Sequence, residues 1–290
     1  MWILWALVSA LCAAVRRTNE KQLTQQLNHF TIGFMIQLLS LPVVGTVMVL
    51  HHDVLNPLHL GWNFWLPLVV ISGGFYPLQT FFYLQSIKQG ELSKVLPLQS
   101  LWPVFSILPA WLLLHELPSW LATVGIACTV LGVYVLGMKQ KALHHPLQPF
   151  REEKASRYMI FTVILVTLAG LLDKVAVEAS NPLFFSFFSS AGAATALYIT
   201  LRVRRINEFQ KLKPMVKNMA GLGALQGSSY TTYLVALATG PVAYVSAIRS
   251  ANVLIGALLG IVLLKEKLTS FKLISFGMIL LGGVLLAIGS

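Results

Sequence analysis

Residues 83–116 read YLQSIKQGELSKVLPLQSLWPVFSILPAWLLLHE, and residues 233–266 read YLVALATGPVAYVSAIRSANVLIGALLGIVLLKE. The two segments align without a gap, and the matches include residues that an apolar composition alone does not explain: Tyr83/Tyr233, Gly90/Gly240, Ser100/Ser250, Glu116/Glu266 and, upstream, Gly73/Gly223. An internal repeat decides the architecture, so it is sought before individual elements. In a membrane protein, two related halves are typical of a transporter.

The amino-acid composition is that of an integral membrane protein, whose outer surface contacts lipid. Of its 290 residues 56% are hydrophobic and 11% are charged, whereas a soluble domain carries about 25% charged residues. The mean hydropathy is +0.74. Cys12 and Cys128 lie in apolar runs and are expected to be small core residues. No positive segment precedes the first apolar run, so we expect an uncleaved first helix rather than a signal peptide.

Apolar segments long enough to cross a bilayer occur ten times along the chain. A spanning helix needs about 20 apolar residues, and the predicted spans are 1–16, 28–50, 64–87, 92–114, 118–138, 158–178, 182–203, 214–238, 242–264 and 270–289. The polar stretch 139–157 links a first repeat, 1–138, to a second, 158–290. Because five helices per repeat is an odd number, the second copy is upside down. The sequence therefore predicts an all-α integral membrane protein of ten transmembrane helices in two inverted five-helix repeats.

The basic residues indicate how the helices are oriented. Of the 21 Lys and Arg residues, 19 lie in the odd-numbered connections, and only Lys174 and Arg249 lie within apolar spans. The positive-inside rule then places the odd connections in the cytoplasm and both termini outside, in the cell (inner) membrane. The net charge of +11 is thus explained by contact with the lipid bilayer, and a nucleic-acid partner is excluded.

The end of each repeat resembles a known family. In each repeat, a helix rich in Pro or small residues is followed by an L-x-E stretch and then by a Gly-rich helix. In the first repeat the stretch is Leu114-His115-Glu116, and the glycines are Gly125, Gly132 and Gly137. In the second the stretch is Leu264-Lys265-Glu266, and the glycines are Gly277, Gly282, Gly283 and Gly289. This pattern resembles the EamA-type transporters of the drug/metabolite transporter superfamily. The resemblance implies ten helices in inverted repeats and a cavity lined by helices one, three, four, six, eight and nine. Family members usually have both termini in the cytoplasm, opposite to the orientation that the charges predict here.

Three charged residues at membrane depth are candidates for a binding site, because such groups are costly in lipid. Asp173 and Lys174 lie roughly 22 Å from the cytoplasmic end of their helix, and Arg249 lies roughly 12 Å from the outer end of its own, at 1.5 Å per residue. Arg249, with Lys174 nearby, would either pair with Asp173 or hold an anionic group of the substrate. The structural alternative is an ion pair near the outer interface, in which Glu178 also contacts Lys174 along one helix face.

The repeat supplies further candidates for the cavity wall. Gln99 occupies the position of Arg249, and Trp102 that of Asn252. The helices that the family resemblance places at the cavity also carry polar side chains: Tyr76, Gln79, Tyr83, Gln226, Tyr230 and Tyr233. Tyrosine has an apolar body and one hydrogen-bonding tip, which suits a small amphipathic ligand. The alternative role for these residues is hydrogen bonding between helices.

These observations favour a secondary transporter of a small polar or amphipathic metabolite. The resemblance implies export of an amino acid or a related compound; a carrier of lipid-linked or nucleotide-sugar substrates is the transport alternative. An intramembrane enzyme is disfavoured, because the predicted spans hold one aspartate, Asp173, and no triad, HExxH or nucleotide loop. The outer-loop residues His51, His52, Asp53 and His59 match no metal-ligand spacing. We therefore expect no cofactor and no metal, no acidic residue in the first helix, and a monomer or homodimer.

Overall fold

The computed structural model describes residues 1–51, 60–90, 95, 98–99, 101–137, 154–252, 254–255 and 270–289. Every regular element in these ranges is a helix. In the first half these are α1 (Trp2–Leu23), α2 (His29–Leu50), α3 (Trp62–Val69), the π-helix η2 (Val70–Phe75), α4 (Tyr76–Gln89), α6 (Trp102–Leu114) and α7 (Trp120–Gly137). In the second they are α9 (Lys154–Glu178), α10 (Pro182–Val203), α11 (Phe209–Leu212), the 3₁₀-helix η4 (Lys213–Met215), α12 (Val216–Thr239), α13 (Val242–Arg249) and α15 (Ser270–Ile288).

The described helices correspond to the ten predicted spans, and the predicted fold class is confirmed. Four spans, 28–50, 158–178, 182–203 and 270–289, match α2, α9, α10 and α15 to within a few residues. The third span is α3, η2 and α4 in continuous sequence, and Gly73 and Gly74 lie in its π-helical turn, where the helix ladder is locally wider. Parts of the predicted spans 92–114 and 242–264, and most of the linker 139–157, lie outside the described residues.

The first helix is longer than predicted. The sequence analysis ended it at residue 16, because two arginines follow, but α1 continues to Leu23. No glycine or proline occurs before residue 33, so nothing in the sequence breaks the helix, and the charged side chains remain on it. Arg16 and Arg17 are consequently part of a helix in the body of the protein, and their assignment to a cytoplasmic connection was wrong.

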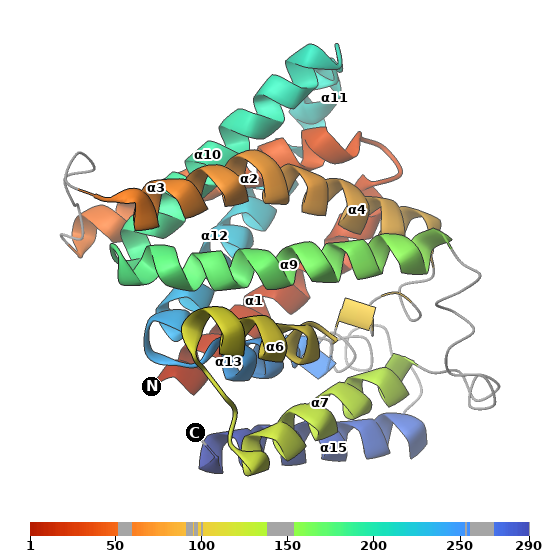
Figure 1. The fold of residues 1–290 in the computed structure, drawn as a ribbon. Coiled ribbons are helices and arrows are strands. Elements are labelled where there is room, and N and C mark those ends of the chain that lie inside the picture. The colour runs from red at the N-terminus through yellow and green to blue at the C-terminus, as the bar shows by residue number, and fades with distance from the viewer. Residues whose placement is uncertain are drawn as a thin grey trace.

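The two repeats run in opposite directions and interlock. In Figure 1, α1 and its counterpart α9 run antiparallel, as do the closing helices α7 and α15, which lie side by side. Each first helix packs against the third helix of the other repeat, α1 on α12 and α9 on α4. The closing helices approach closely through glycines: a Cβ on Gly282 would lie 2.2 Å from Thr129 Oγ1 and 2.6 Å from Gly125 O. In membrane proteins, small residues at a helix interface let the two backbones approach this closely.

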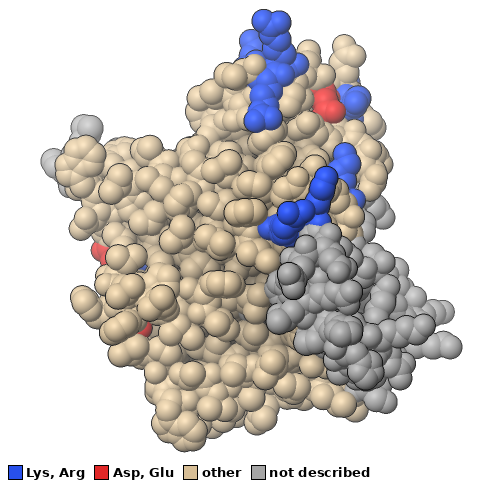
Figure 2. Space-filling model, turned by 45° about the vertical axis from the view of Figure 1, so that its right-hand side comes forward, with Lys and Arg blue, Asp and Glu red and all other residues tan. Residues whose placement is uncertain are grey.

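The face of the molecule drawn in Figure 2 is largely uncharged where its residues are described. Figure 2 shows Lys and Arg gathered near the top of the view and beside the undescribed residues, with a broad area free of charge elsewhere. Among the described residues, His29–Leu50, Lys154–Glu178 and Pro182–Val203 are each long and apolar enough to cross a bilayer, and Trp102–Leu114, Trp120–Val135 and Leu273–Ile288 are shorter apolar helices. The helix α1 is more polar than these, because it carries Arg16, Arg17 and Glu20, which face inward, as described below.

Candidate functional site

A polar cavity lies between the two repeats, with a volume of about 130 Å³. Helices of both halves contribute to its wall. The apolar part is formed by Ile32, Ile36, Ile71, Leu84, Val166 and Ala169, and the polar part by Arg16, Arg17, Glu20, Gln37, Tyr76, Gln79, Thr80, Tyr83, Gln99, Trp102, Asp173, Ser189, Gln226, Tyr230, Tyr233, Arg249, Ser250 and Asn252. Its volume is below the range of about 300–1,000 Å³ that is usual for ligand pockets, but its wall combines apolar surface with convergent polar groups, as ligand sites do.

The structure brings nearly all the predicted site residues together. Arg249, Gln99, Asp173, Tyr76, Gln79, Tyr83, Trp102, Gln226, Tyr230, Tyr233 and Asn252 all line the cavity. Residues from the fourth and ninth spans, such as Gln99 and Arg249, occur on the same wall although 150 residues separate them. Lys174 is the exception, and its position is described below.

One group of polar contacts surrounds Asp173. The Tyr230 hydroxyl donates to Asp173 Oδ1 at 2.7 Å and lies 3.2 Å from Ser189 Oγ. The Arg249 guanidinium lies over the Tyr233 ring, with its Cζ 4.3 Å from the centroid, and over the Trp102 ring at 5.5 Å. Such cation–π contacts stabilise a buried cation without neutralising it. Within the described part of the chain, no ion pair joins Asp173 to Arg249, so the predicted pairing is absent from this conformation.

A second group was missed by the sequence analysis and belongs to α1. Arg16 forms an ion pair with Glu20 one turn further along, and the Tyr83 hydroxyl donates to Glu20 Oε2 at 3.1 Å. Arg17 Nη1 donates to Asn252 Oδ1 at 2.6 Å, a contact between the first and the ninth spans. The expectation that the first helix carries no acidic residue was therefore wrong, because it depended on ending that helix at residue 16.

A second repeat offset would have revealed this group. Asn28 and Asn181 are both N-caps, each accepting from a backbone N–H in the first turn of its helix, α2 or α10. Aligning these two asparagines places Glu20 at the position of Asp173. The offset is 153 rather than 150 because the third span is longer in the first repeat: from the end of the second span to the end of the third there are 39 residues in the first repeat (51–89) and 36 in the second (204–239). Both repeats thus carry an acid at one position of their first helix, and each acid accepts a tyrosine hydroxyl.

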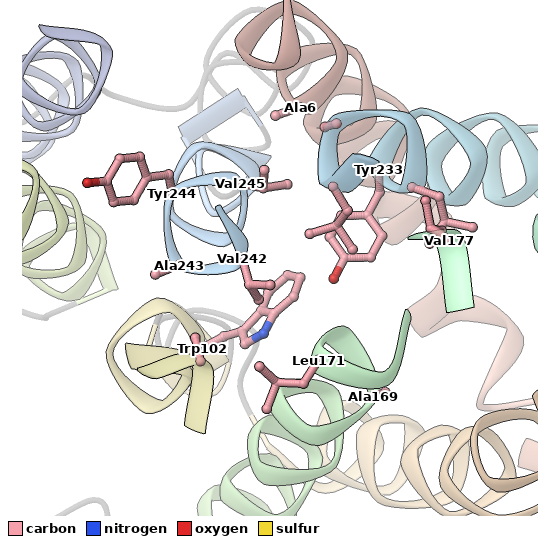
Figure 3. Close-up of a cluster of buried hydrophobic side chains, with 14 of the residues drawn as sticks. Ala6, Trp102, Ala169, Leu171, Val177, Tyr233, Val242, Ala243, Tyr244 and Val245 are labelled. Carbon is pink, nitrogen blue, oxygen red and sulfur yellow. The ribbon is translucent and has the colours of Figure 1, made fainter. Parts of the chain in front are cut away.

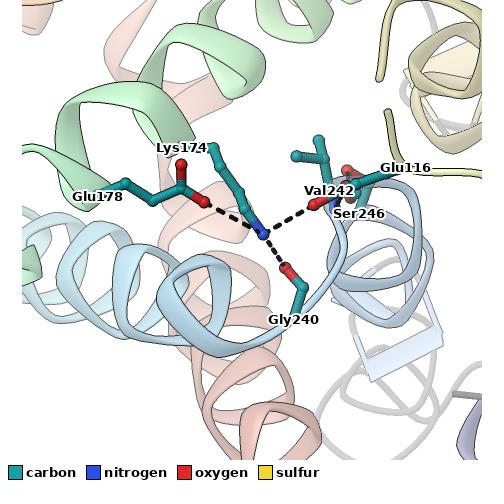
Figure 4. Close-up of polar contacts among 6 residues, drawn as sticks. All are labelled: Glu116, Lys174, Glu178, Gly240, Val242 and Ser246. Atoms are coloured by element: carbon teal, nitrogen blue, oxygen red, sulfur yellow. Dashed lines mark hydrogen bonds and ion pairs between the residues drawn. The ribbon is translucent and has the colours of Figure 1, made fainter. Parts of the chain in front are cut away.

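Lys174 lies at a joint between the repeats, not in the cavity (Figure 4). Its Nζ is 2.8 Å from Glu116 Oε1 and 3.9 Å from Glu178 Oε1, and it donates to the Gly240 carbonyl at 3.0 Å. Glu116 also accepts from the Val242 N–H, at the first turn of α13. The prediction that Lys174 lies near Arg249 in the site was wrong, because successive helix residues point about 100° apart. Asp173 faces the cavity and its neighbour therefore faces away.

Among the described residues, none from the helix ends nearest the termini lines the cavity. Beyond Asp173 and Tyr233, the ends of the helices pack through a buried cluster that includes Ala6, Val177, Val242 and Tyr244, part of which is drawn in Figure 3. Together with the joint at Lys174, this cluster fills the space between the described helix ends on the side on which N and C lie in Figure 1. In the opposite direction, the polar wall extends to Glu20, three residues from the end of α1.

Inverted helical repeats around a polar cavity are typical of membrane transporters. A family comparison names the group within that class. The model of the EamA-like transporter family matches residues 1–138 and 154–288, and the chain belongs to that family. It is thus a multi-pass membrane protein of a transporter family, and the resemblance seen at the L-x-E stretches is confirmed.

The fold is shared with a solved structure of low sequence identity. That structure, titled "Crystal structure of protein", superposes with a TM-score of 0.74 at 14% identity, covering 99% of this chain and 95% of the other. At this identity the likeness concerns the fold alone. A comparison with curated proteins found no match.

Proposed function

We propose that the protein is a secondary transporter that moves a small polar or amphipathic metabolite, an amino acid or a related compound, out of the cell by alternating access. The observation that carries this proposal is the polar cavity shared by the two inverted repeats and closed toward the termini. Alternating access requires a central site with one closed side at a time, and this arrangement supports one such state. Export is the typical role in the family, and the direction follows from it.

We further propose that the termini lie outside and the odd-numbered connections lie in the cytoplasm. The loss of Arg16 and Arg17 from the first connection weakens the charge count only slightly. Exposed basic residues remain at the described ends of the odd connections: Lys88, Lys154, Arg157, Arg202, Arg204, Arg205, Lys211, Lys213 and Lys217. Among the described residues of the even connections, none is Lys or Arg. This asymmetry supports the orientation under the positive-inside rule, and it makes the cavity closed to the outside here.

The transport proposal is tested by flux across a defined membrane. The purified protein is reconstituted into liposomes loaded with a pool of amino acids and related organic acids, and the external medium is analysed by mass spectrometry. We expect time-dependent release of one or a few pool members, and no release from protein-free liposomes. Release of no pool member above that background would contradict the proposal.

Orientation is tested separately by labelling. Single cysteines are introduced at Arg204 and at Ser180 in a background in which Cys12 and Cys128 are replaced by serine, and intact cells are treated with an impermeant maleimide. We expect labelling at 180 before lysis and labelling at 204 only after lysis. The reverse pattern would place the termini in the cytoplasm.

A further inference from the structure

Several polar atoms on the cavity wall are buried without a hydrogen-bond partner in the described part of the chain. They are Arg16 Nε, Arg17 Nε, Gln99 Oε1, Trp102 Nε1 and the Tyr233 hydroxyl. An unsatisfied buried polar group is costly, and most such groups in native proteins are paired. All five residues line one cavity. This concentration indicates that the cavity is built for an occupant that supplies the missing partners.

The unpartnered atoms are mainly donors. The two arginine nitrogens and the indole nitrogen can only donate, the tyrosine hydroxyl can donate or accept, and only Gln99 Oε1 is restricted to accepting. An occupant that satisfies this set must therefore be rich in acceptors. Carboxylate oxygens meet this requirement, since each accepts more than one hydrogen bond.

Two of these donors and one cation form a compact corner. The Trp102 indole nitrogen and the Tyr233 hydroxyl both lie beside Gly170: a Cβ there would be 2.8 Å from the hydroxyl and 3.8 Å from Nε1. Figure 3 shows the two groups directed toward the same space above Leu171. The Arg249 guanidinium covers both rings. Glycine at position 170 keeps this corner free of a side chain.

The charges on the wall favour the same ligand chemistry. Among the described lining residues there are three cations, Arg16, Arg17 and Arg249, and two carboxylates, Glu20 and Asp173. Arg16 is neutralised by Glu20, whereas no described carboxylate lies within ion-pair distance of Arg17 or Arg249. The wall therefore carries one net positive charge. In a medium of low dielectric constant, such a charge attracts a single negative charge strongly.

We infer that Trp102 Nε1, the Tyr233 hydroxyl and Arg249 bind the carboxylate of a small, net-anionic ligand in the cavity that all three residues line. This inference rests on the proposed transport function and narrows its substrate class to carboxylates. Asp173, which lines the same cavity and accepts from the Tyr230 hydroxyl, then faces the remainder of the ligand. The assignment differs from a simple pairing of Arg249 with Asp173, because it assigns roles to an indole and a phenol.

The test uses three probes that share one branched carbon skeleton and differ in charge. Binding of 4-methylpentanoate, leucine and 3-methylbutylamine to the full-length protein in detergent is measured by isothermal titration calorimetry. We expect the acid to bind most tightly, leucine less tightly, and the amine about tenfold or more weaker than the acid. Tightest binding of the amine, or binding of none of the three, would overturn the inference.

Variants then locate the site. Trp102→Phe and Tyr233→Phe each keep the ring under Arg249 and remove one donor, and we expect each to weaken binding of the acid about tenfold, since a hydrogen bond to a charged group is worth that much. Trp120→Phe and Tyr198→Phe, at exposed positions, are matched controls with unchanged affinity. Equal affinities in all four variants would overturn the assignment of the corner. If pooled metabolites are still released from liposomes at the wild-type rate by Trp102→Phe and Tyr233→Phe, the inference fails while the transport function stands.

Discussion

The cavity and the joint at Lys174 are two polar regions that contain adjacent residues of α9, Asp173 and Lys174. They differ in how many of their polar atoms have a hydrogen-bond or ion-pair partner in the protein. At the joint, Lys174 contacts two carboxylates and a carbonyl, and Glu116 also caps α13. In the cavity, Asp173 accepts from one tyrosine, and neighbouring donors have no partner among the described residues. Both residues are intramembrane charges in the sequence. If the cavity binds a ligand as we infer, the two regions differ in the number of partners that the protein supplies, and neither burial nor charge alone distinguishes them.

The comparison predicts opposite effects of substitution in the two regions. A cavity residue makes its important contacts with a ligand, so its removal should affect transport and leave the fold intact. A joint residue makes its contacts with the protein, so its removal should reduce stability. The predictions below test this separation in order of decreasing effect.

Arg249→Ala should reduce transport most. We expect release of the transported metabolite to fall about 100-fold, because removing a desolvated charge from a binding site costs about 3 kcal/mol and each 1.4 kcal/mol is tenfold. The temperature of unfolding should stay within a few degrees of wild type. The measurement is liposome flux together with thermal unfolding of the purified variant.

The matched control for Arg249 is Arg202→Ala. Arg202 lies over the Tyr198 ring at 5.8 Å, on the exposed end of α10, so it makes the same type of contact outside the cavity. We expect no change in its flux. Wild-type flux for Arg249→Ala at normal expression would remove Arg249 from the site.

The sequence predicted the architecture well because the fold depends on properties that a sequence displays directly. Apolar length defined the spans, and the repeat of residues 83–116 in 233–266 defined the two halves. The repeat also identified Gln99 as a candidate site residue, because Gln99 occupies the position of Arg249 in the other repeat. The sequence analysis missed some site residues because it could not determine where helices end or which way their faces point. Arg16, Arg17 and Glu20 were not considered for the cavity, because the first helix was predicted to end at residue 16.

Helix facing was the second limit. Asp173 and Lys174 have the same depth and neighbourhood in the sequence, and only the packing of α9 shows which one faces the cavity. The unpartnered state of Trp102 Nε1 and the Tyr233 hydroxyl is likewise a property of three-dimensional surroundings. Composition and spacing carry no record of it.

Lys174→Met should destabilise the protein. It leaves the half-buried Glu116 without its main counter-ion, 2.8 Å away, and breaking such a pair costs about 3 kcal/mol. We expect a clear fall in unfolding temperature. The double variant Lys174→Met, Glu116→Gln should recover part of the loss, since no uncompensated charge remains.

The control for the joint is Lys211→Met, which breaks an exposed pair with Glu208 at 3.4 Å. An exposed pair contributes less than about 1 kcal/mol. Lys174→Met could instead be as stable as wild type and lose transport. That result would show that the joint takes part in transport, and it would contradict the separation of a structural joint from a ligand-binding cavity.

Gly282→Ala should have an intermediate effect, far from either polar region. The added Cβ would meet Thr129 and the Gly125 carbonyl at less than 3 Å, so α7 and α15 must separate. Overpacking of this kind costs about 2 kcal/mol. Gly277→Ala, on the same helix with nothing within 4 Å of its Cβ, should leave the unfolding temperature unchanged. If both variants unfold at the wild-type temperature, the close contact of these helices does not contribute to stability.

The smallest effect concerns Glu208, outside the membrane-spanning helices. It accepts from the Asn28 N–H at 2.7 Å and from the Thr31 hydroxyl at 2.9 Å, and so holds the start of α2. Burial tends to raise the pKa of this carboxyl, but these hydrogen bonds and Lys211 outweigh burial, and the pKa is lowered from its usual value of 4.5. The charged form is therefore favoured by folding. The resulting stabilisation is present above pH 4.5 and is lost as the pH falls through the lowered pKa.

Glu208→Gln should thus reduce the free energy of unfolding by about 1 kcal/mol at neutral pH, and the deficit relative to wild type should shrink on acidification below the lowered pKa. Thermal unfolding at neutral and acidic pH measures both quantities. Glu178→Gln, whose side chain is 56% exposed, is the control with little effect at either pH. A deficit for Glu208→Gln that is the same at both pH values would show that the carboxyl acts through shape rather than charge, because a charge-dependent contact must disappear when the wild-type carboxyl takes up a proton.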